Sequence, residues 1–328
     1  MDRKLCVLVT GASGFVGRHL VTRLRSRFDD AIEIVPTDKE AGLDPEFGAV
    51  QALDVTDDRA AADVIASTQP THVVHLSAMS APSDADVDPR AAWMVNALGT
   101  LSVAEAILRR APSACLVFAS TGLVYGAAAT PARPFTEDTP MAPISDYAVT
   151  KASADLLIGA MASRGLRSIR LRLFNHTGPG QSRRFVVPNF AAQIARIEAG
   201  VQAPRMQVGS LTALRDFVDV RDVVAAYVAA IVRSQQLPPS PIINIASGRG
   251  HTIGEILSRL IALSPAQIEI EAGGPSPLGQ PDSGVGDASL AARLLGWKPE
   301  YGMQQTLISV LDYWRERTQA EVASIRPR

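Results

Sequence analysis

Short apolar runs alternate with longer amphipathic stretches through the first half of the chain. The runs hold four to six residues with little polar alternation, which is typical of strands buried on both faces of a sheet. They predict strands over residues 5–10, 32–37, 50–53, 72–76, 116–119 and 168–173. The stretches between them predict helices over 15–27, 57–67, 91–110 and 147–164. This alternation indicates parallel strands joined by right-handed crossovers, and therefore an α/β fold with a doubly wound, Rossmann-like parallel sheet.

The regular alternation of predicted strands and helices ends after Phe174. Loops richer in Gly and Pro separate segments that predict helices over 187–199, 220–233, 252–263, 288–295 and 303–317. Short strands are predicted over 242–245 and 268–270, and the last ten residues are expected to fray. We therefore predict a first domain, mainly residues 1–174, and a smaller C-terminal α/β domain, mainly residues 175–328, with the chain crossing back to the first domain within 208–246.

Composition excludes several classes of protein. Hydrophobic residues make up 47% and charged residues 20% of the chain, which excludes a disordered protein. A net charge of -1 gives the protein as a whole no reason to bind nucleic acid or anionic lipid. The longest uninterrupted apolar run, residues 223–232, is about half of a membrane span, so we expect no membrane association.

The cysteines and histidines predict neither a disulfide framework nor a metal site. Cys6 and Cys115 each lie inside an apolar run and are expected to be buried thiols. His72 and His75 are three apart on a predicted strand, so their side chains point to opposite faces, and the other histidines have no partner at ligand spacing. The apolar run at residues 5–9 is too short for a signal-peptide core, so we expect a cytoplasmic protein.

A glycine-rich turn follows the first predicted strand and opens the first predicted helix. Gly11 permits a tight turn, Gly14 lets backbone amides approach a pyrophosphate, and Gly17 lets the helix pack closely on the sheet. The helix N-terminus adds unpaired N–H groups and the positive end of its dipole. We therefore expect a dinucleotide at this turn, and the residues expected to bind it are Gly11, Ser13, Gly14, Phe15 and Val16.

Two carboxylates at strand ends bear on the choice of cofactor. Asp38 ends the second strand, where it would accept hydrogen bonds from the adenosine ribose and repel a 2′-phosphate. This favours NAD(H), while the neighbouring Lys39 can offset the repulsion and leaves NADP(H) open. Asp54 ends the third strand and would face the adenine; the alternative is a turn or helix-capping aspartate.

Three polar residues form a candidate catalytic group. Tyr147 and Lys151 are one helical turn apart, so both side chains lie on one face of their helix. A nearby ammonium favours the phenolate, which would make Tyr147 a usable acid–base group near neutral pH. Thr121 follows the fifth strand, whose end points into the same crevice as the glycine turn. Its hydroxyl would share the hydrogen bonding of a carbonyl oxygen with Tyr147.

Together these features resemble the extended short-chain dehydrogenase/reductases, the family of NAD-dependent nucleotide-sugar epimerases, dehydratases and reductases. The resemblance covers nearly the whole chain. Besides the glycine turn and Tyr147…Lys151, it rests on His75-Leu76-Ser77-Ala78, Asn96, Ser120-Thr121, Val124-Tyr125-Gly126, Phe174-Asn175, Arg215-Asp216-Phe217, Asp219-Val220, Asp222-Val223 and Asn244-Ile245…Gly248. Through residues 175–181 and 185–188, the chain is most similar to GDP-4-dehydro-6-deoxy-D-mannose reductases within the family.

The resemblance implies a role for each matching residue. Tyr147 would be the catalytic acid or base, Lys151 would lower its pKa and hold the nicotinamide ribose, and Thr121 would bind the carbonyl. The residues implied to contact the cofactor, besides those of the turn, are Asp38, Asp54, Val55, Leu76, Ser77, Ala78, Asn96, Ala119, Ser120, Tyr147 and Lys151. The first domain would then bind the dinucleotide and the second a nucleotide sugar.

The implied substrate contacts are Ser80, Thr121, Asn175, Val186, Val187 and Arg215. For Arg215 a structural salt bridge with Asp219 or Asp222 is the alternative. Relatives usually carry a diphosphate-clamping arginine in the C-terminal domain, but residues 277–282 of this chain contain none, which leaves the nucleotide open. Relatives also pair the helices over 91–110 and after Tyr147 into a four-helix bundle, which implies a homodimer.

The reaction type depends on the two residues directly after Thr121. Dehydratases of the family carry carboxylates there, whereas this chain has Gly122 and Leu123, which cannot exchange protons. With dehydration excluded, the resemblance to GDP-4-dehydro-6-deoxy-D-mannose reductases implies the NAD(P)H-dependent reduction of a 4-keto-6-deoxy nucleotide sugar, of the type that yields GDP-D-rhamnose. The alternatives are an NAD-dependent nucleotide-sugar 4-epimerase of the UDP-glucose/galactose type and a non-catalytic dinucleotide sensor.

Overall fold

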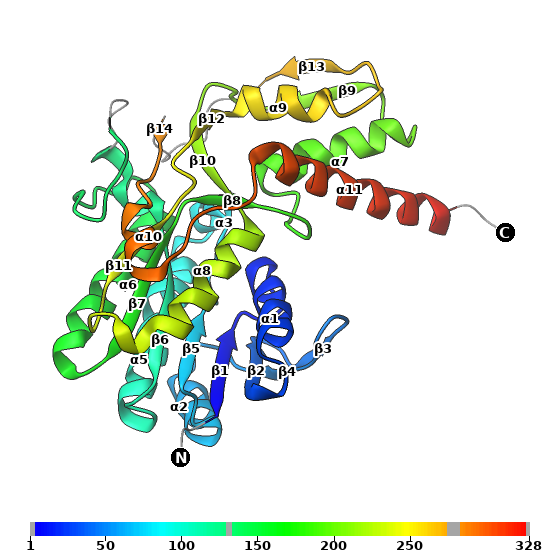
Figure 1. Ribbon diagram of the computed structural model, residues 1–328. Coiled ribbons are helices and arrows are strands. Elements are labelled where there is room, and N and C mark those ends of the chain that lie inside the picture. Colours follow the sequence, from blue (N-terminus) through cyan, green and yellow to red (C-terminus); the bar gives the residue numbers. More distant parts are fainter. Residues whose placement is uncertain (1–3, 129–132, 274–282, 326–328) are drawn as a thin grey trace.

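A large parallel sheet forms the centre of the computed structural model, which describes residues 4–128, 133–273 and 283–325 (Figure 1). Within these residues the sheet has eight strands in the order β11-β7-β6-β5-β1-β2-β4-β3. Only the short β3 runs antiparallel to its neighbour. The strands are β1 (Leu5–Thr10), β2 (Ile32–Asp38), β3 (Gly42–Asp44), β4 (Gly48–Ala52), β5 (His72–His75), β6 (Cys115–Thr121), β7 (Arg167–Leu173) and β11 (Ile242–Ile245).

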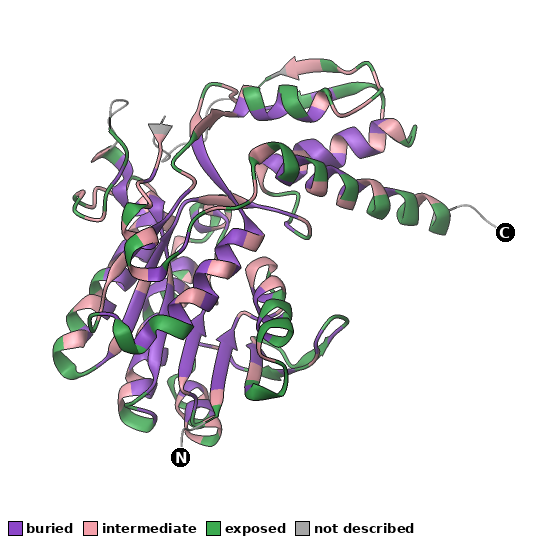
Figure 2. Cartoon of the chain, viewed as in Figure 1, coloured by how far each residue is buried: buried purple, intermediate pink, exposed green. Residues whose placement is uncertain are grey.

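Helices cover both faces of this sheet, as the unbroken apolar runs predict (Figures 1 and 2). Alternate residues of β1 point to opposite faces, so Val7 and Val9 pack against α1 and α8, whereas Leu8 packs against α2, α5 and α6. The first face carries α1 (Phe15–Phe28), α8 (Val220–Arg233) and α10 (Ser289–Leu295); the second carries α2 (Asp58–Thr68), α5 (Gly99–Arg110) and α6 (Asp146–Met161). The doubly wound fold is therefore confirmed.

The second half of the chain contributes to both parts of the molecule. Helices α7 (Val186–Glu198), α9 (Ile253–Ile261) and α11 (Met303–Ile325) share a separate apolar core with β9 (Arg205–Val208) and β13 (Glu269–Ala272), at the upper right of Figure 1. A small sheet joins β8 (Asn175–Thr177), β10 (Leu214–Asp219), β12 (Gly250–Thr252) and β14 (Ser283–Gly284). In contrast, β11, α8 and α10 complete the large sheet and its covering layer.

Two local predictions need correction, and several short strands, β10 among them, were not predicted. The helix expected over 91–110 is divided into α4 (Pro89–Ala92), a π-helical segment (Trp93–Leu98) and α5. Residues 319–325 do not fray, because α11 continues to Ile325. Strand β10 was not predicted, since its charged residues Arg215 and Asp216 do not fit the pattern of a buried strand, although both are buried. The remaining helices are α3 (Pro82–Val87) and 3-10 segments at Asp29–Ala31, Gly122–Ala128, Ala162–Arg164 and Ser234–Gln236.

One helical stretch, Pro89–Arg110, is long and apolar enough to cross a membrane by length and composition. Half of its most apolar window is buried inside the molecule, and α5 packs against α2 and α6. A core helix of a globular protein has the same properties. Its exposed apolar side chains, Trp93, Met94 and Leu98, lie in the π-helical segment.

Candidate active site

The glycine turn lies where the strand order of the large sheet reverses, between β1 and its neighbours β2 and β5. Gly11 has φ +68°, and a Cβ at this position would lie 2.9 Å from the backbone nitrogen of Ser77. A Cβ at Gly17 would lie 2.4 Å from the carbonyl oxygen of Gly11. Only glycine therefore lets helix α1 begin this close to the ends of β1 and β5.

The turn fits the phosphates of a dinucleotide. Helix α1 begins after the exposed Gly14, and no side chain among the described residues caps its N-terminus. Its first N–H groups and the positive end of its dipole are thus available to an anion. The Asp38 carboxylate accepts hydrogen bonds from the backbone N–H of Ser13 (3.1 Å) and of Lys39 (2.8 Å), so it lies directly beside the turn. This is where a ribose hydroxyl of a dinucleotide would need an acceptor.

The structure shows Asp54 in the alternative, turn-forming arrangement. Its Oδ1 accepts hydrogen bonds from the backbone N–H (2.9 Å) and hydroxyl (2.7 Å) of Thr56, and its Oδ2 lies 3.7 Å from Lys39 Nζ. The hydrogen bonds to Thr56 lower the pKa of the Asp54 carboxyl. A contact of Asp54 or the buried Val55 with adenine stays a prediction.

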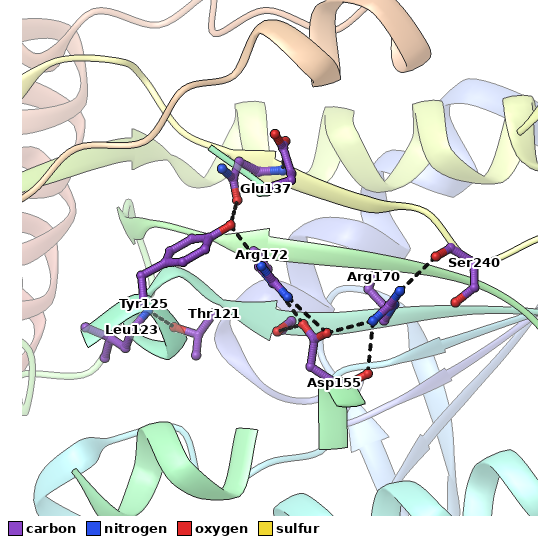
Figure 3. A network of polar contacts seen from close by, with 10 residues as sticks. Thr121, Leu123, Tyr125, Glu137, Asp155, Arg170, Arg172 and Ser240 are labelled. Atoms are coloured by element: carbon purple, nitrogen blue, oxygen red, sulfur yellow. Dashed lines mark hydrogen bonds and ion pairs between the residues drawn. The ribbon is translucent and has the colours of Figure 1, made fainter. Parts of the chain in front are cut away.

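Two elements, β6 and α6, carry the candidate catalytic residues Thr121, Tyr147 and Lys151. Thr121 is the last residue of β6. Helix α6 carries Tyr147 and Lys151 on one face. Its N-cap residue, Ser145, accepts a hydrogen bond from the backbone N–H of Ala148 (3.3 Å). Thr121 Oγ1 accepts a hydrogen bond from the backbone N–H of Leu123 (3.2 Å; Figure 3). The Thr121 hydroxyl also hydrogen-bonds the side chain of Tyr147, so these two candidate catalytic groups are in direct contact.

Burial shifts the acid–base properties of this group. Loss of water raises the pKa of the Tyr147 phenol to about 12, with the Thr121 hydroxyl acting in the opposite direction. Burial also lowers the pKa of Lys151 to about 7, opposed by the negative charge of Asp155. Lys151 Nζ lies 4.4 Å from the centre of the Phe118 ring. The sequence predicts a lowered phenol pKa, but in this structure desolvation is the larger effect and keeps Tyr147 protonated at neutral pH.

The other predicted cofactor residues lie at the same edge of the sheet. Leu76, Ser77 and Ala78 follow β5, and Ala119 and Ser120 precede Thr121 on β6. Asn96 is fully buried and supports this edge from below, because it accepts a hydrogen bond from the backbone N–H of Met79 (2.8 Å) and donates one to Thr150 Oγ1 (3.0 Å). Since Met79 precedes the exposed Ser80, Asn96 fixes the loop that carries that residue.

The predicted substrate residues come from the small sheet and α7. Asn175 begins β8 and is half-buried; Val186 and Val187 open α7, which no side chain among the described residues caps. Arg215 on β10 is 6% exposed and donates to the backbone oxygen of Leu214 (2.9 Å).

The carboxylates proposed as salt-bridge partners of Arg215 are bound by other residues. Asp219 accepts hydrogen bonds from Arg221 and Thr306. Asp222 accepts hydrogen bonds from the backbone N–H groups of Glu300 and Tyr301. The segment 277–282, where the sequence resemblance leads one to expect a clamping arginine, lies outside the described residues.

Sequence reasoning missed a buried ionic cluster next to the candidate catalytic residues. Asp155 of α6 contacts Ser120 of β6 and both Arg170 and Arg172 of β7 (Figure 3). The available signal is an isolated carboxylate four residues after Lys151, in a helix otherwise rich in Ala and Leu. In sequence alone, such a position is indistinguishable from a solvent-exposed one.

Comparison with known proteins gives matches along nearly the whole chain. Residues 7–246 match the NAD dependent epimerase/dehydratase family. A GDP-6-deoxy-D-mannose reductase from Pseudomonas aeruginosa is 32% identical over 96% of this chain and 99% of its own length. Two solved structures cover 95% of this chain and are themselves covered to 99%: RMD from Pseudomonas aeruginosa complexed with NADPH (TM-score 0.84, 31% identity) and UDP-glucose 4-epimerase from Thermus thermophilus in complex with NAD (TM-score 0.83, 28% identity).

Proposed function

Because the chain belongs to the NAD dependent epimerase/dehydratase family, we propose that it reduces the 4-keto group of a 6-deoxy nucleotide sugar. GDP-4-dehydro-6-deoxy-D-mannose is the substrate to test first, and a GDP-D-rhamnose-type product is expected. The 32% identical relative, a GDP-6-deoxy-D-mannose reductase, supports this choice. The cofactor is a nicotinamide dinucleotide, as in the NADPH and NAD complexes of similar structures. We propose a preference for NAD(H), supported by Asp38 beside the turn.

The observation that carries the proposal is the environment of position 122. A Cβ at Gly122 would lie 3.1 Å from the ring of Phe174, so the packing leaves little room for a carboxylate beside Thr121. Leu123, the next residue, has no titratable group. Dehydration of a sugar needs an acid and a base next to the ring in addition to Tyr147. The site therefore supports hydride transfer with one proton relay rather than elimination of water.

The residues divide the work of a ketone reduction. When bound, the nicotinamide supplies the hydride that adds to the ketone carbon. Tyr147, which is protonated at neutral pH, donates its phenol proton to the ketone oxygen. The Thr121 hydroxyl, oriented by the Leu123 N–H, donates a hydrogen bond to the same oxygen as negative charge develops there. Lys151 is one turn away and in its charged form stabilises the phenolate that remains.

A 4-epimerase is the second candidate. Its support is the UDP-glucose 4-epimerase structure with nearly the same TM-score as the reductase structure. Epimerisation begins by oxidising a sugar hydroxyl, so Tyr147 would first have to accept a proton. Burial raises the pKa of Tyr147, which favours the proton-donor role and hence the reductase.

The test supplies purified protein with NADH or NADPH and GDP-4-dehydro-6-deoxy-D-mannose. We expect stoichiometric loss of the reduced cofactor's absorbance and a reduced sugar nucleotide in the mass spectrum. Interconversion of UDP-glucose and UDP-galactose without net cofactor turnover would establish the epimerase instead. Formation of a 4-keto-6-deoxy product from GDP-mannose, UDP-glucose or dTDP-glucose would contradict both, because it requires dehydration.

We propose a cytoplasmic homodimer in which α5 and α6 of each copy form a four-helix bundle. Exposed apolar side chains support it: Leu156 on α6 is 61% exposed, and Leu98, directly before α5, is 47% exposed. Light scattering should give twice the mass of the chain for the wild type. Leu156→Glu should give the monomer mass, whereas Val232→Glu, which changes an exposed apolar residue on α8, should leave the dimer intact. A monomeric wild type would refute the dimer.

A further inference from the structure

A buried carboxylate connects the catalytic helix with the strands beneath it. Asp155 has no exposed surface and lies on α6, one turn after Lys151. It accepts hydrogen bonds from Ser120 Oγ (2.6 Å), from Arg172 Nε (3.1 Å) and from Arg170 Nη1 (3.0 Å) (Figure 3). Three contacts thus tie α6 to β6 and β7. Ser120 directly precedes Thr121, so the first of them joins the element carrying Tyr147 to the element carrying Thr121.

The contacts continue toward the second half of the chain. Arg172 Nη1 donates to the hydroxyl of Tyr125 (3.1 Å), which donates to the side chain of Asn244 (2.6 Å). The backbone N–H of Asn244 in turn donates to Glu137 (2.7 Å). Tyr125, Arg172 and Asn244 are all buried. The cluster cannot move without breaking hydrogen bonds that water cannot replace, so Asp155 is held rigidly.

We propose that Asp155 is a positioning residue for the proposed reaction: its carboxylate fixes the distance between α6 and the strand of Thr121, and its charge holds Lys151 as the ammonium ion. This inference rests on the proposed function for the role of Lys151. The geometry of the Asp155 cluster stands independently of it.

The charges around Lys151 make Asp155 its decisive neighbour. From its own helix Lys151 faces Tyr147, which is neutral, and Asp155. From β5 it faces His75, whose pKa of about 3 keeps it neutral near pH 7. From β7, Arg170 and Arg172 add two positive charges next to Asp155. Among these groups the sole negative charge in the described structure is that of Asp155, and it opposes the desolvation that lowers the pKa of Lys151.

A test of the proposal follows the titration of Lys151 directly. The chain has four lysines, Lys4, Lys39, Lys151 and Lys298, so protein labelled with ¹³C at lysine Cε gives few signals, and a Lys151→Met sample assigns the relevant one. In Asp155→Asn we expect the Lys151 midpoint to fall by about one pH unit or more, as expected when an opposite charge is removed. The pH at which kcat/KM declines on the alkaline side should fall by the same amount. At pH values above that decline, kcat/KM should therefore be about tenfold lower than in the wild type.

A second variant should shift the Lys151 midpoint in the opposite direction, and it tests the proposal even if Asp155→Asn does not fold. Arg170 is 12% exposed at its side chain and competes with Lys151 for Asp155, so Arg170→Gln should move the midpoint upward. Arg167→Gln is the matched control, because Arg167 lies on the same strand but donates to the backbone of Ser234. Unchanged Lys151 midpoints in Arg170→Gln and in folded Asp155→Asn would overturn the proposal, as would an upward shift in Asp155→Asn. If Asp155→Asn does not fold, the Arg170→Gln result decides alone.

The two proposals fail in different ways. If the wild type shows no turnover of the ketone, the proposed function fails, while the titration of Lys151 still reports whether Asp155 controls its charge. If turnover is present and the midpoints do not move, the role of Asp155 fails alone.

Discussion

Acid should destabilise this protein through two histidines buried in the large sheet. His75 ends β5 with Nδ1 2.8 Å from Thr10 Oγ1 and Nε2 3.1 Å from Thr100 Oγ1. Thr100 donates its own proton to the backbone oxygen of Asn96 (2.7 Å), so it accepts from Nε2, and the neutral ring carries its proton there. Thr10 must then donate to Nδ1. A second proton on Nδ1 would break this arrangement directly beneath the glycine turn.

The expected loss of stability follows from the two pKa values. Burial lowers the pKa of His75 to about 3 and that of His72 to about 4, from an ordinary value of 6.5. The unfolded chain therefore binds protons below pH 6.5 that the folded chain does not, so the free energy of unfolding falls as the pH drops toward 4. Each pH unit costs about 1.4 kcal/mol per histidine. Between pH 7.5 and pH 4.5 the pair should remove about 5 kcal/mol.

Urea denaturation followed by circular dichroism at the two pH values measures this loss. His75→Gln and His72→Gln lower stability at pH 7.5, but in each the difference between the two pH values should shrink by about 2.7 kcal/mol. Carboxylates that titrate in the same range contribute equally to wild type and variants, so they cancel. His19→Gln, at a half-buried position on α1, is the control. Equal pH differences in wild type and His75→Gln would refute the reasoning.

Three further predictions concern the candidate site. Tyr147→Phe removes only a proton donor, so kcat should fall by about 10²–10⁴-fold with cofactor affinity unchanged; retention of more than about a tenth of kcat would remove its assigned role. Asp38→Ala should raise the NADPH-to-NADH ratio of kcat/KM, and an unchanged ratio would mean that the ribose is recognised elsewhere. Gly17→Ala places a Cβ 2.4 Å from the carbonyl oxygen of Gly11 and 2.5 Å from that of Ala12, so the free energy of unfolding should fall by about 1–3 kcal/mol. A thermal midpoint equal to that of the wild type would contradict this.

The large sheet and the dinucleotide turn were predictable because short-range features determine them. Residues such as Val7, Leu8 and Val9 form an unbroken apolar run since both faces of β1 are covered, and this run is visible in sequence. The turn needs glycine at positions 11 and 17 for reasons of backbone geometry that depend on few neighbours. The spacing of Tyr147 and Lys151 likewise follows from helical periodicity alone.

The parts that escaped prediction depend on partners distant in the chain. Asp216 of β10 is buried because Ser247, Gly248 and Gly286, at least 31 residues away, donate hydrogen bonds to it. Partners this distant leave no pattern in the sequence around Asp216, so the residues of β10 resembled a polar loop. The raised pKa of Tyr147 has the same origin, since its desolvation depends on the residues that the complete fold packs around the phenol and not on the spacing to Lys151.

The position of β11 at the edge of the large sheet affects how the protein folds during synthesis. When the first 174 residues have left the ribosome, β7 has no outer neighbour, and the face later covered by α8 and α10 exposes apolar side chains. An unpaired edge and an uncovered sheet face are the features that promote aggregation of nascent chains. The strand partner arrives with Ile242–Ile245, and the last covering helix ends at Leu295. Nearly the entire chain must therefore be made before its first-synthesised sheet is protected, which makes late translation the period of greatest need for chaperones.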